Sequence, residues 1–342
     1  MGTGFILGIE TSCDETSAAV VERGGRMLSL VTSSQARLHR KYGGVVPEVA
    51  GRAHLEALLP VIREALSQAG IGYRDLEGVA VTRGPGLIGS LLVGLTAAKA
   101  ICFALGLPLL AVNHLEAHIY ANFMHFPELE PPLLSFVVSG GHTLLVHMPA
   151  HRRYRVLGET LDDAAGEAYD KIARFLGLGY PGGPEIDRLS GKGNPQAVPF
   201  PRALLHDGTY NFSLSGLKTA VINYVRRMRE EGKEVCVEDV AASFQAAVVE
   251  VQVHKIVRAV EETGVRKVAL AGGVAANRYL RSKLGEALGE KGAELYYPPG
   301  YLCADNAAMV AYLGWLMLEE GDVVPLDVDA AASLPLPETQ EA

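Results

Sequence analysis

The chain carries one pattern twice, and this repeat restricts the fold more than any other feature of the sequence. Residues 5–34 (FILGIETSCDETSAAVVERGGRMLSLVTSS) predict a strand, an acidic polar turn, a strand, a Gly-Gly hairpin and a strand. Residues 133–160 (LLSFVVSGGHTLLVHMPAHRRYRVLGET) predict strands and turns in the same order. A second pair, residues 78–102 and 267–288, predicts in each copy a buried strand, a Gly-rich turn and a helix. The period far exceeds the roughly 20 to 50 residues of a solenoid unit, so we predict an α/β protein of two duplicated lobes.

The boundary between the lobes is expected at residues 125–133 (HFPELEPPL), where prolines separate a helix from a strand. We predict an N-terminal lobe over residues 1–131, joined by a C-terminal helix at 305–325, and a C-terminal lobe over 132–304. Residues 327–342 are expected to form a flexible tail. Because open α/β sheets bind ligands at the ends of their strands, we expect a ligand cleft between the lobes.

Composition and charge narrow the class of protein. The 342 residues are 49% hydrophobic and 20% charged, which is typical of a folded chain with a sizeable core. The net charge of −8 argues against a nucleic-acid binder held by a general positive field, so any RNA contact should be a local basic patch. Short basic clusters stand at residues 37–41, 151–155 and 226–229.

Cysteine usage and hydropathy point to the cytoplasm. The four cysteines include no CxxC pair, so they predict neither a disulfide framework nor a zinc ribbon. The first residues do not have the pattern of a signal peptide. The long apolar region over residues 87–112 is interrupted by Lys99, Gly106 and Pro108, which favours a buried helix and strand over a membrane span.

Two histidines raise the question of a metal site. His114 and His118 lie four residues apart in a predicted helix, so they share one face and can hold a single ion, or they are helix histidines bonded to neighbours. A zinc protease of the HExxH type needs a glutamate directly after the first histidine, where this chain has Leu115 and places Glu116 one residue later. Asp305, at the entry of another predicted helix, is either its N-cap or a third ligand. Two histidines and one carboxylate suit iron or zinc and leave positions for a substrate.

Three Gly-rich turns are candidate ligand sites. Ser139–His142 (SGGH) is either an anion cradle or a plain hairpin turn. Residues 271–277 (AGGVAAN) follow a strand and open a helix, which suits a nucleotide, although the segment lacks both GxGxxG and a Walker lysine. Residues 180–187 (YPGGPEID) predict a helix with Pro184 at its first position.

The roles of four carboxylates are left open by the sequence. Asp187, in the predicted first turn of its helix, either complements the helix dipole or accepts bonds from ribose hydroxyls. The role of Asp170, inside a predicted helix, is undecided by local sequence. Asp14 and Glu15, in the first polar turn, are either solvent-exposed or orient a nucleophile or a metal.

Eight blocks in order carry a family resemblance: GIETSCDETSAAVV, GPGLIGSLLVGLTAAKA, NHLEAHIYA, VSGGHT, GEAYDKIARFLGLGYPGGP, FSLSGLKTA, GGVAANRYLR and DNAAMVA. Together they resemble the tRNA N6-adenosine threonylcarbamoyltransferase family (TsaD), formerly described as O-sialoglycoprotein endopeptidases, and SCDET resembles its bacterial branch. The resemblance spans almost the whole chain. It implies two duplicated actin-like or Hsp70-like (ASKHA, RNase H-like) ATPase lobes with a nucleotide cleft between them.

The resemblance also implies the reaction and the site. The threonylcarbamoyl group would pass from threonylcarbamoyl-AMP to N6 of the adenosine beside the anticodon, in tRNAs that read codons beginning with adenine. One divalent metal ion would be held by His114, His118 and Asp305, with iron preferred over zinc as its identity. Asp14 and Glu15 would have a catalytic role. The substrate-binding residues would be Val137, Val138, Ser139, Gly140, Gly141, Asp170, Gly183, Asp187 and Asn277.

The implied partners are tRNA, a smaller paralogous subunit (TsaB) and a P-loop ATPase (TsaE), with no membrane. The alternative is a nucleotide-regulated Hsp70-like or actin-like binding ATPase, because folds of this kind also host kinases, chaperones and filaments. The metal set separates the two readings, since such ATPases bind magnesium through the phosphates of their nucleotide.

Overall fold

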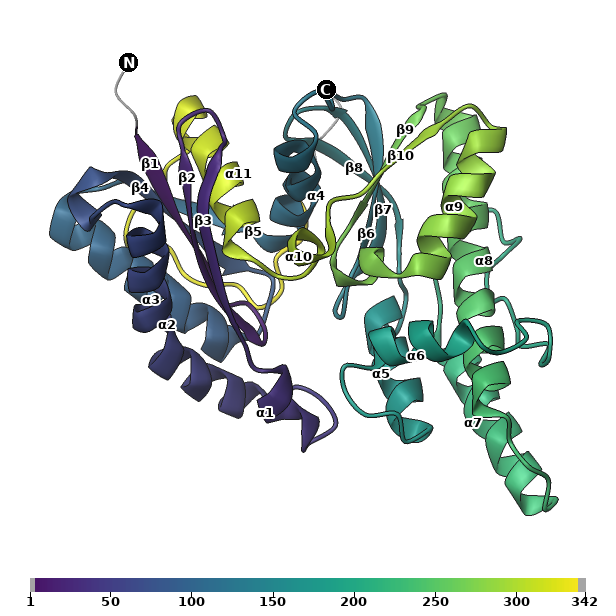
Figure 1. Cartoon of the computed structure of the whole chain (residues 1–342). Coiled ribbons are helices and arrows are strands. Elements are labelled where there is room, and N and C mark those ends of the chain that lie inside the picture. Colours follow the sequence, from purple (N-terminus) through teal and green to yellow (C-terminus); the bar gives the residue numbers. More distant parts are fainter. Residues whose placement is uncertain (1–3, 338–342) are drawn as a thin grey trace. The chain divides into compact units, whose positions relative to one another are not determined.

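The computed structural model describes residues 4–337 and divides into two compact units (Figure 1). Unit 1 consists of the residues up to Leu129 together with Pro298–Leu336. Unit 2 is the intervening segment, Glu130–Tyr297. The chain therefore leaves unit 1, builds unit 2 and returns to complete unit 1.

Unit 1 is built on a mixed five-stranded sheet in the order β3-β2-β1-β4-β5. The first three strands form an antiparallel meander, and β4 and β5 run parallel to β1. The strands are β1 (Phe5–Glu10), β2 (Glu15–Glu22), β3 (Met27–Ser34), β4 (Leu76–Gly84) and β5 (Leu109–Asn113). The helices are α1 (Ala36–Arg40), α2 (Pro47–Ala69), α3 (Ile88–Leu105), α4 (His114–His125), α10 (Gly300–Cys303) and α11 (Ala307–Glu320), with a 3₁₀ turn η1 (Tyr73–Asp75).

Unit 2 repeats this plan in a second five-stranded sheet, in the order β8-β7-β6-β9-β10. Again the first three strands are an antiparallel meander and the last two run parallel to the first. The strands are β6 (Leu133–Val138), β7 (Thr143–Ala150), β8 (Arg153–Glu159), β9 (Lys267–Ala271) and β10 (Glu294–Tyr296). The helices are α5 (Ala165–Phe175), α6 (Gly182–Ser190), α7 (Ser215–Glu230), α8 (Val237–Thr263) and α9 (Arg278–Glu290), with a 3₁₀ turn η2 (Gly273–Ala276). The predicted duplication is confirmed strand by strand, whereas the predicted cleft stays a prediction.

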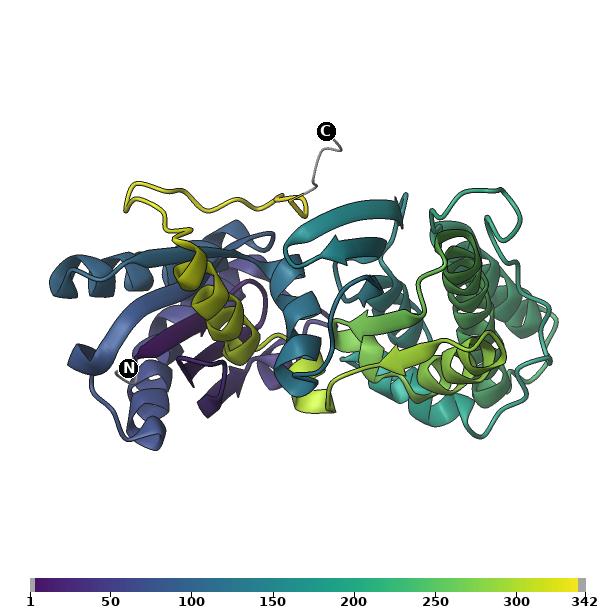
Figure 2. The ribbon, with the colours of Figure 1, turned by 90° about the horizontal axis from the view of Figure 1, so that it is seen from above.

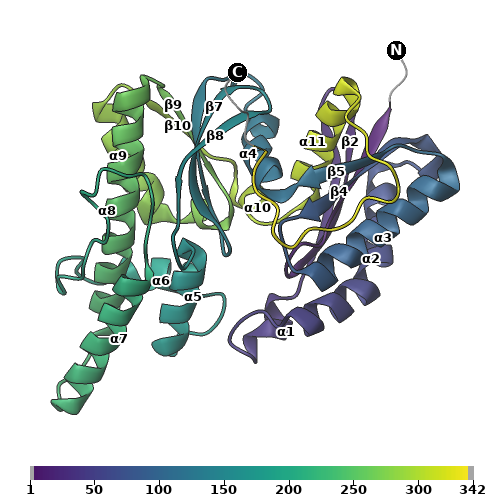
Figure 3. The same cartoon turned by 180° about the vertical axis from the view of Figure 1, so that it is seen from behind.

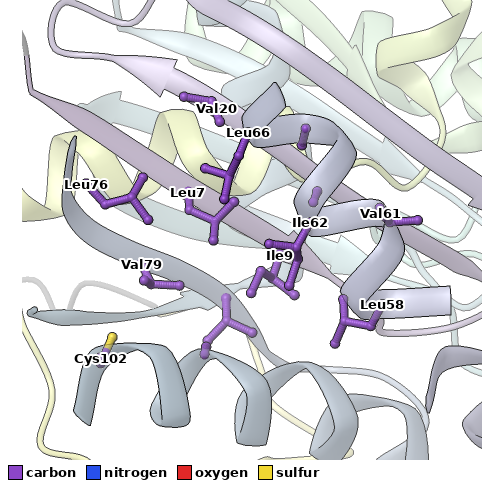
Figure 4. Packing of buried hydrophobic residues seen from close by; sticks show 14 of the residues in the cluster. Leu7, Ile9, Val20, Leu58, Val61, Ile62, Leu66, Leu76, Val79 and Cys102 are labelled. Atoms are coloured by element: carbon purple, nitrogen blue, oxygen red, sulfur yellow. The ribbon is translucent and has the colours of Figure 1, made fainter. Parts of the chain in front are cut away.

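Alternation along the central strands of unit 1 decides which helix covers which face. Leu7, Ile9 and Val20 face α2 and α3, where they join the buried cluster drawn in Figure 4. The residues between them face α11: a Cβ at Gly8 would lie 2.3 Å from the carbonyl oxygen of Ala307. The missing side chain therefore lets the first turn of α11 pack directly on β1.

The segment after α11 corrects the expectation of a flexible tail. The backbone amide of Ala331 donates to the carbonyl oxygen of Arg83 over 3.0 Å, and the Asn113 side-chain amide donates to the carbonyl oxygen of Pro335 over 2.8 Å. Leu336 is buried. Figures 2 and 3 show this segment, in yellow, running along unit 1. It is held there because its backbone bonds to β4 and to the start of α4; residues 338–342 lie outside the described residues.

The apolar region at 87–112 forms α3 and β5, as predicted. By length and hydropathy α3 could cross a membrane, which is weak evidence because core helices pass the same test. One side of α3 packs on β4 and α2, but Ile88, Leu92 and Phe103 are exposed. The helix is thus only partly buried, which the sequence did not predict.

Candidate functional site

Three side chains of unit 1 converge on one point. The Asp305 Oδ1 atom lies 3.1 Å from Nε2 of His118 and 3.5 Å from Nε2 of His114. The two imidazole rings stand nearly perpendicular, at 79°, with centroids 4.6 Å apart. One ligand atom from each of the three residues lies within 4.8 Å of the others. The structure therefore brings together the three residues for which the sequence predicts a shared ion.

This spacing fits a metal ion. Nitrogen and oxygen ligands about 2.0–2.2 Å from a tetrahedral ion lie roughly 3.3 Å from one another, and the two Nε2–Oδ1 separations are 3.1 and 3.5 Å. The donor set, two imidazoles and one carboxylate, suits zinc or iron and does not by itself decide between them. His114 and His118 are buried, which shields the ligands from competing water.

The chain positions the histidines by ending β5 directly at the start of α4. Asn113, the last residue of β5, caps the helix: its Oδ1 accepts the backbone amides of Leu115 and Glu116. His114 is then the first residue of the helix and His118 follows one turn later on the same face.

The structure corrects one reading of Asp305. The N-cap of α11 is Asn306, whose side chain accepts the backbone amide of Met309 over 3.1 Å. Asp305 stands one residue before the cap, and its carboxylate faces the histidines instead. The sequence could not separate these roles because both residue types are good caps.

Electrostatics couple the three residues and Glu10. Burial disfavours a charge on His114, but the carboxylates of Asp305 and Glu10 outweigh it and raise the pKa of His114 to about 9. Burial lowers the pKa of His118, and the charge on His114 lowers it further. A metal ion that binds these residues must therefore displace a proton from His114.

Asp14 and Glu15 follow β1 in the same unit. Glu15 opens β2, and its Oε1 accepts the Ser34 hydroxyl over 2.7 Å, whereas its buried Oε2 has no partner among the described residues. Burial is the main reason that the pKa of Glu15 is raised to about 7, and the charges of Asp14 and Asp305 add to it. A carboxyl that titrates near neutrality is suited to proton transfer.

In unit 2, two Gly-rich turns meet at the carboxyl ends of adjacent parallel strands. Ser139–His142 is the turn between β6 and β7. The Ser139 amide donates to the His142 carbonyl oxygen over 2.8 Å, and the His142 amide donates to the Ser139 hydroxyl over 3.1 Å. The next turn starts at Gly272, with φ +88, where a Cβ would lie 2.5 Å from the Val138 carbonyl oxygen. A Cβ at Gly140 or Gly141 would meet no atom within 4 Å, so the turn borders open space on that side. The hydrogen bonds show the hairpin, and the anion cradle stays a prediction.

The other predicted ligand residues of unit 2 lie around these turns. Val137 and Val138 are buried at the end of β6, so they offer backbone atoms only. Asp170 in α5 accepts the Gly182 amide over 2.7 Å, at the start of α6. A Cβ at the next residue, Gly183, would meet no atom within 4 Å. The helix begins at Gly182 rather than at Pro184 as predicted.

Asp187 and Asn277 are joined through a residue that sequence reasoning missed. Gln245, buried in α8, accepts the Asn277 side-chain amide over 2.8 Å and donates to Asp187 over 3.5 Å. Asp187 also accepts Arg278 Nε over 2.8 Å, and Asn277 caps α9 through the Leu280 amide. Because α6 begins early, Asp187 lies beyond its first turn, so the dipole reading loses its basis. The signal for Gln245 was a lone amide within the apolar run AASFQAAVV.

Comparison with known proteins gives the family of the chain and supports its fold. The family model described as TsaD, tRNA N6-adenosine threonylcarbamoyltransferase, matches residues 26–312. The enzyme of that name from Symbiobacterium thermophilum is 56% identical over 98% of both chains. Among solved structures, T. kodakarensis HypF has a TM-score of 0.64 at 17% identity, covering 93% of this chain and 48% of its own. Component A of the Acidaminococcus fermentans (R)-2-hydroxyglutaryl-CoA dehydratase has a TM-score of 0.55 at 15% identity, covering 92% and 99%. The structural likenesses confirm the predicted two-lobe α/β fold, and the sequence matches establish that the chain belongs to the TsaD family of tRNA N6-adenosine threonylcarbamoyltransferases.

Proposed function

We infer that this chain transfers a threonylcarbamoyl group from threonylcarbamoyl-AMP to N6 of the adenosine beside the anticodon, in tRNAs that read codons beginning with adenine. The observation that carries the inference is the His114–His118–Asp305 set in a chain that matches the TsaD family over nearly its whole length. The same fold hosts nucleotide-regulated binding ATPases, but those bind their magnesium through nucleotide phosphates and need no such set. We assign the activity to the cytoplasm, where the tRNA substrate is modified.

The metal set of unit 1 suits the phosphate and carbamoyl end of the adenylate. One divalent ion would be held by His114, His118 and Asp305, with iron preferred over zinc as its identity. The remaining coordination positions would be left to the substrate. When bound, such an ion supplies positive charge to the phosphate and carbamoyl oxygens. Because the two histidines are buried, they would hold the ion in a fixed position. Much of the rate acceleration should come from positioning N6 of the adenosine, which is a weak nucleophile.

The turns of unit 2 suit the nucleotide. The turn at Gly140 and Gly141 borders open space where their Cβ atoms would stand, and we assign the anionic end of the adenylate to this turn. Asp187 is a candidate acceptor for ribose hydroxyls, and the Asn277–Gln245 pair fixes the start of α9 beside it. Asp170 and Gly183 would shape the same approach, since Asp170 holds the start of α6.

Glu15 is our candidate proton acceptor. In the transfer, a bond forms between N6 and the carbamoyl carbon, the bond from that carbon to the phosphate oxygen breaks, and N6 loses a proton. One Glu15 oxygen is held by Ser34 and the other has no partner among residues 4–337, so the second can accept that proton. Asp14, its neighbour, supports this role by raising the pKa of Glu15.

The smaller paralogous subunit is assigned to the outer face of α2 and α3. These helices cross closely where Gly51 meets Gly89, and large apolar side chains beside the crossing are exposed: Leu55, Leu59, Ile88 and Leu92. Exposed apolar patches of this kind are typical of protein–protein interfaces. A subunit built on the same lobe plan would offer an equivalent helix pair. We propose the P-loop ATPase (TsaE) as the other protein partner.

The proposed reaction predicts a modified tRNA. The chain, its partner subunits, threonylcarbamoyl-AMP and an unmodified ANN-decoding tRNA are incubated, and the digested tRNA is measured by mass spectrometry. We expect threonylcarbamoyladenosine, and no cleavage of a protein substrate in a parallel reaction. AMP release without modified nucleoside in the complete system would refute the transferase and favour a nucleotide-hydrolysing ATPase.

The metal and the nucleotide are predicted to depend on different residues. His114→Ala with His118→Ala should remove the metal, because only Asp305 of the three ligands remains. Asp187→Ala should keep the metal and weaken AMP binding about tenfold, the loss expected for one hydrogen bond to a charged group. Elemental analysis and calorimetry measure both quantities.

Each variant is the control for the other. Asn277→Asp adds a finer test, since it keeps the acceptor that caps α9 but loses the amide that donates to Gln245. Full metal content in the histidine variant would refute the metal assignment. Unchanged AMP affinity in both unit 2 variants would place the nucleotide elsewhere.

The assignment of Glu15 predicts a pH dependence. The pKa of Glu15 is about 7 without a metal, and a cation at Asp305 lowers it, so activity should fall as pH drops through 7 or somewhat below. Glu15→Gln should lower the rate about 100-fold, and the fall of activity at low pH (the acid limb of the pH profile) should disappear. Ser34→Ala removes the hydrogen bond that lowers this pKa, so the limb should move to higher pH. A limb that keeps its position in Ser34→Ala would exclude Glu15 as the titrating group.

The assigned face predicts a variant with an isolated defect. Leu55→Glu with Leu92→Glu should abolish binding of the smaller subunit, since a charge buried without a partner is strongly unfavourable, and should leave metal content unchanged. Leu161→Glu, at a residue of unit 2 that is 64% exposed, is the matched control. Calorimetric titration with the smaller subunit measures the effect. Wild-type affinity in the double variant would move the interface elsewhere.

A further inference from the structure

A buried carboxylate stands behind the metal ligand His114. Glu10 ends β1, and its side chain has no exposure to solvent. Its Oε2 accepts the Thr82 hydroxyl over 2.6 Å and lies 3.1 Å from Nδ1 of His114. Its Oε1 accepts the backbone amide of Ser12. Parallel pairing of β1 with β4, which sets Ile9 beside Val81, places the next residues of these strands, Glu10 and Thr82, side by side.

The two nitrogens of His114 therefore face different groups. Nδ1 faces Glu10, and Nε2 faces Asp305 over 3.5 Å, on the side of the predicted ion. A carboxylate accepts only, so it selects the tautomer with the proton on Nδ1 and leaves the Nε2 lone pair for a metal. His118 has no such support, because its Nδ1 has no hydrogen-bond partner among the described residues.

We propose that Glu10 is a positioning residue for the metal: it fixes the ring of His114 and its Nε2-binding tautomer, and so increases metal affinity. The inference rests on the metal assignment made above. Carboxylates that accept the second nitrogen of a ligand histidine typically contribute a factor of about 10 to 100 in metal affinity.

The surroundings of Glu10 favour this role over that of a plain ion pair with His114. Thr82 and Ser12 bond the carboxylate independently of His114, so its position is set before a metal arrives. The Ser12 hydroxyl also lies 3.3 Å from Nδ1 of His114, which adds a second polar contact on the same side of the ring. A buried carboxylate is costly, and here the Thr82 hydroxyl and the Ser12 amide offset part of that cost and hold Glu10 where it faces His114.

The test compares zinc affinity and the protonation of His114 in folded variants. Glu10→Gln keeps the shape of the side chain but turns an amide group toward one of its donors. We expect zinc affinity, measured by chelator competition, to fall about 10- to 100-fold. In the zinc-loaded protein labelled with ¹⁵N-histidine, Nδ1 of His114 should be protonated in the wild type, and this signature should be lost or mixed in Glu10→Gln. Thr82→Val keeps the charge and loses one supporting bond, so its affinity should be intermediate.

Thr16→Val is the matched control. Thr16 is buried in the same sheet and bonds Nδ1 of His54 over 2.8 Å, so its loss removes a comparable bond away from the ligands. Zinc affinity should be unchanged in this variant. Wild-type affinity and a wild-type spectrum in folded Glu10→Gln would overturn the proposal, and if that variant does not fold, unchanged affinity in Thr82→Val would do so.

The double variant His114→Ala, His118→Ala separates this proposal from the metal assignment. If it keeps zinc, the metal assignment falls and Glu10 has no ligand to position. If it loses zinc while Glu10→Gln binds zinc normally, only the role of Glu10 falls.

Discussion

The contact between β1 and the first turn of α11 is the constraint on which the meeting of His114, His118 and Asp305 depends. At Gly8 the strand has no side chain, so the Ala307 carbonyl can approach the sheet closely. That contact fixes the start of a helix whose sequence lies nearly 200 residues after the histidines of α4. Any side chain at Gly8 would push α11 outward and carry Asp305 away from His118. This close backbone approach therefore helps to set the position of Asp305 relative to the two histidines.

Around His114 and Asp305, uncharged residues cap the helices and charged residues face one another. Asn113 and Asn306 cap the two helices, which leaves the adjacent His114 and Asp305 to face each other. Unit 2 uses the same arrangement at Asn277, which caps α9 beside Asp187. An asparagine cap carries no charge, so the field at each site is set by neighbouring carboxylates and imidazoles.

The sequence predicted the duplicated fold because alternating apolar residues and Gly-rich turns are local signals, and they recur in both halves. It also singled out His114 and His118 by their helical spacing and Asp305 as a carboxylate at a helix entry, and the structure brings these three candidate ligands together. Glu10, Gln245 and Arg278 were missed, because their importance comes from pairing across strands or helices far apart in sequence. One clue was present for Glu10: it is the charged last residue of an otherwise apolar strand. The packed segment up to Leu336 was missed as well, since backbone bonds to β4 leave no mark in composition.

The return of the chain to unit 1 has a consequence for its synthesis. Asp305 and the carbonyl of Pro335, which accepts the side-chain amide of Asn113, both follow unit 2 in the sequence and so leave the ribosome after it. All of Glu130–Tyr297 emerges before them. Unit 2 can therefore fold during translation while unit 1 still lacks Asp305, α11 and the segment that follows it. A chain interrupted before residue 305 therefore has only the two histidines of the His114–His118–Asp305 set. The set is complete only after the whole of unit 2 has been translated.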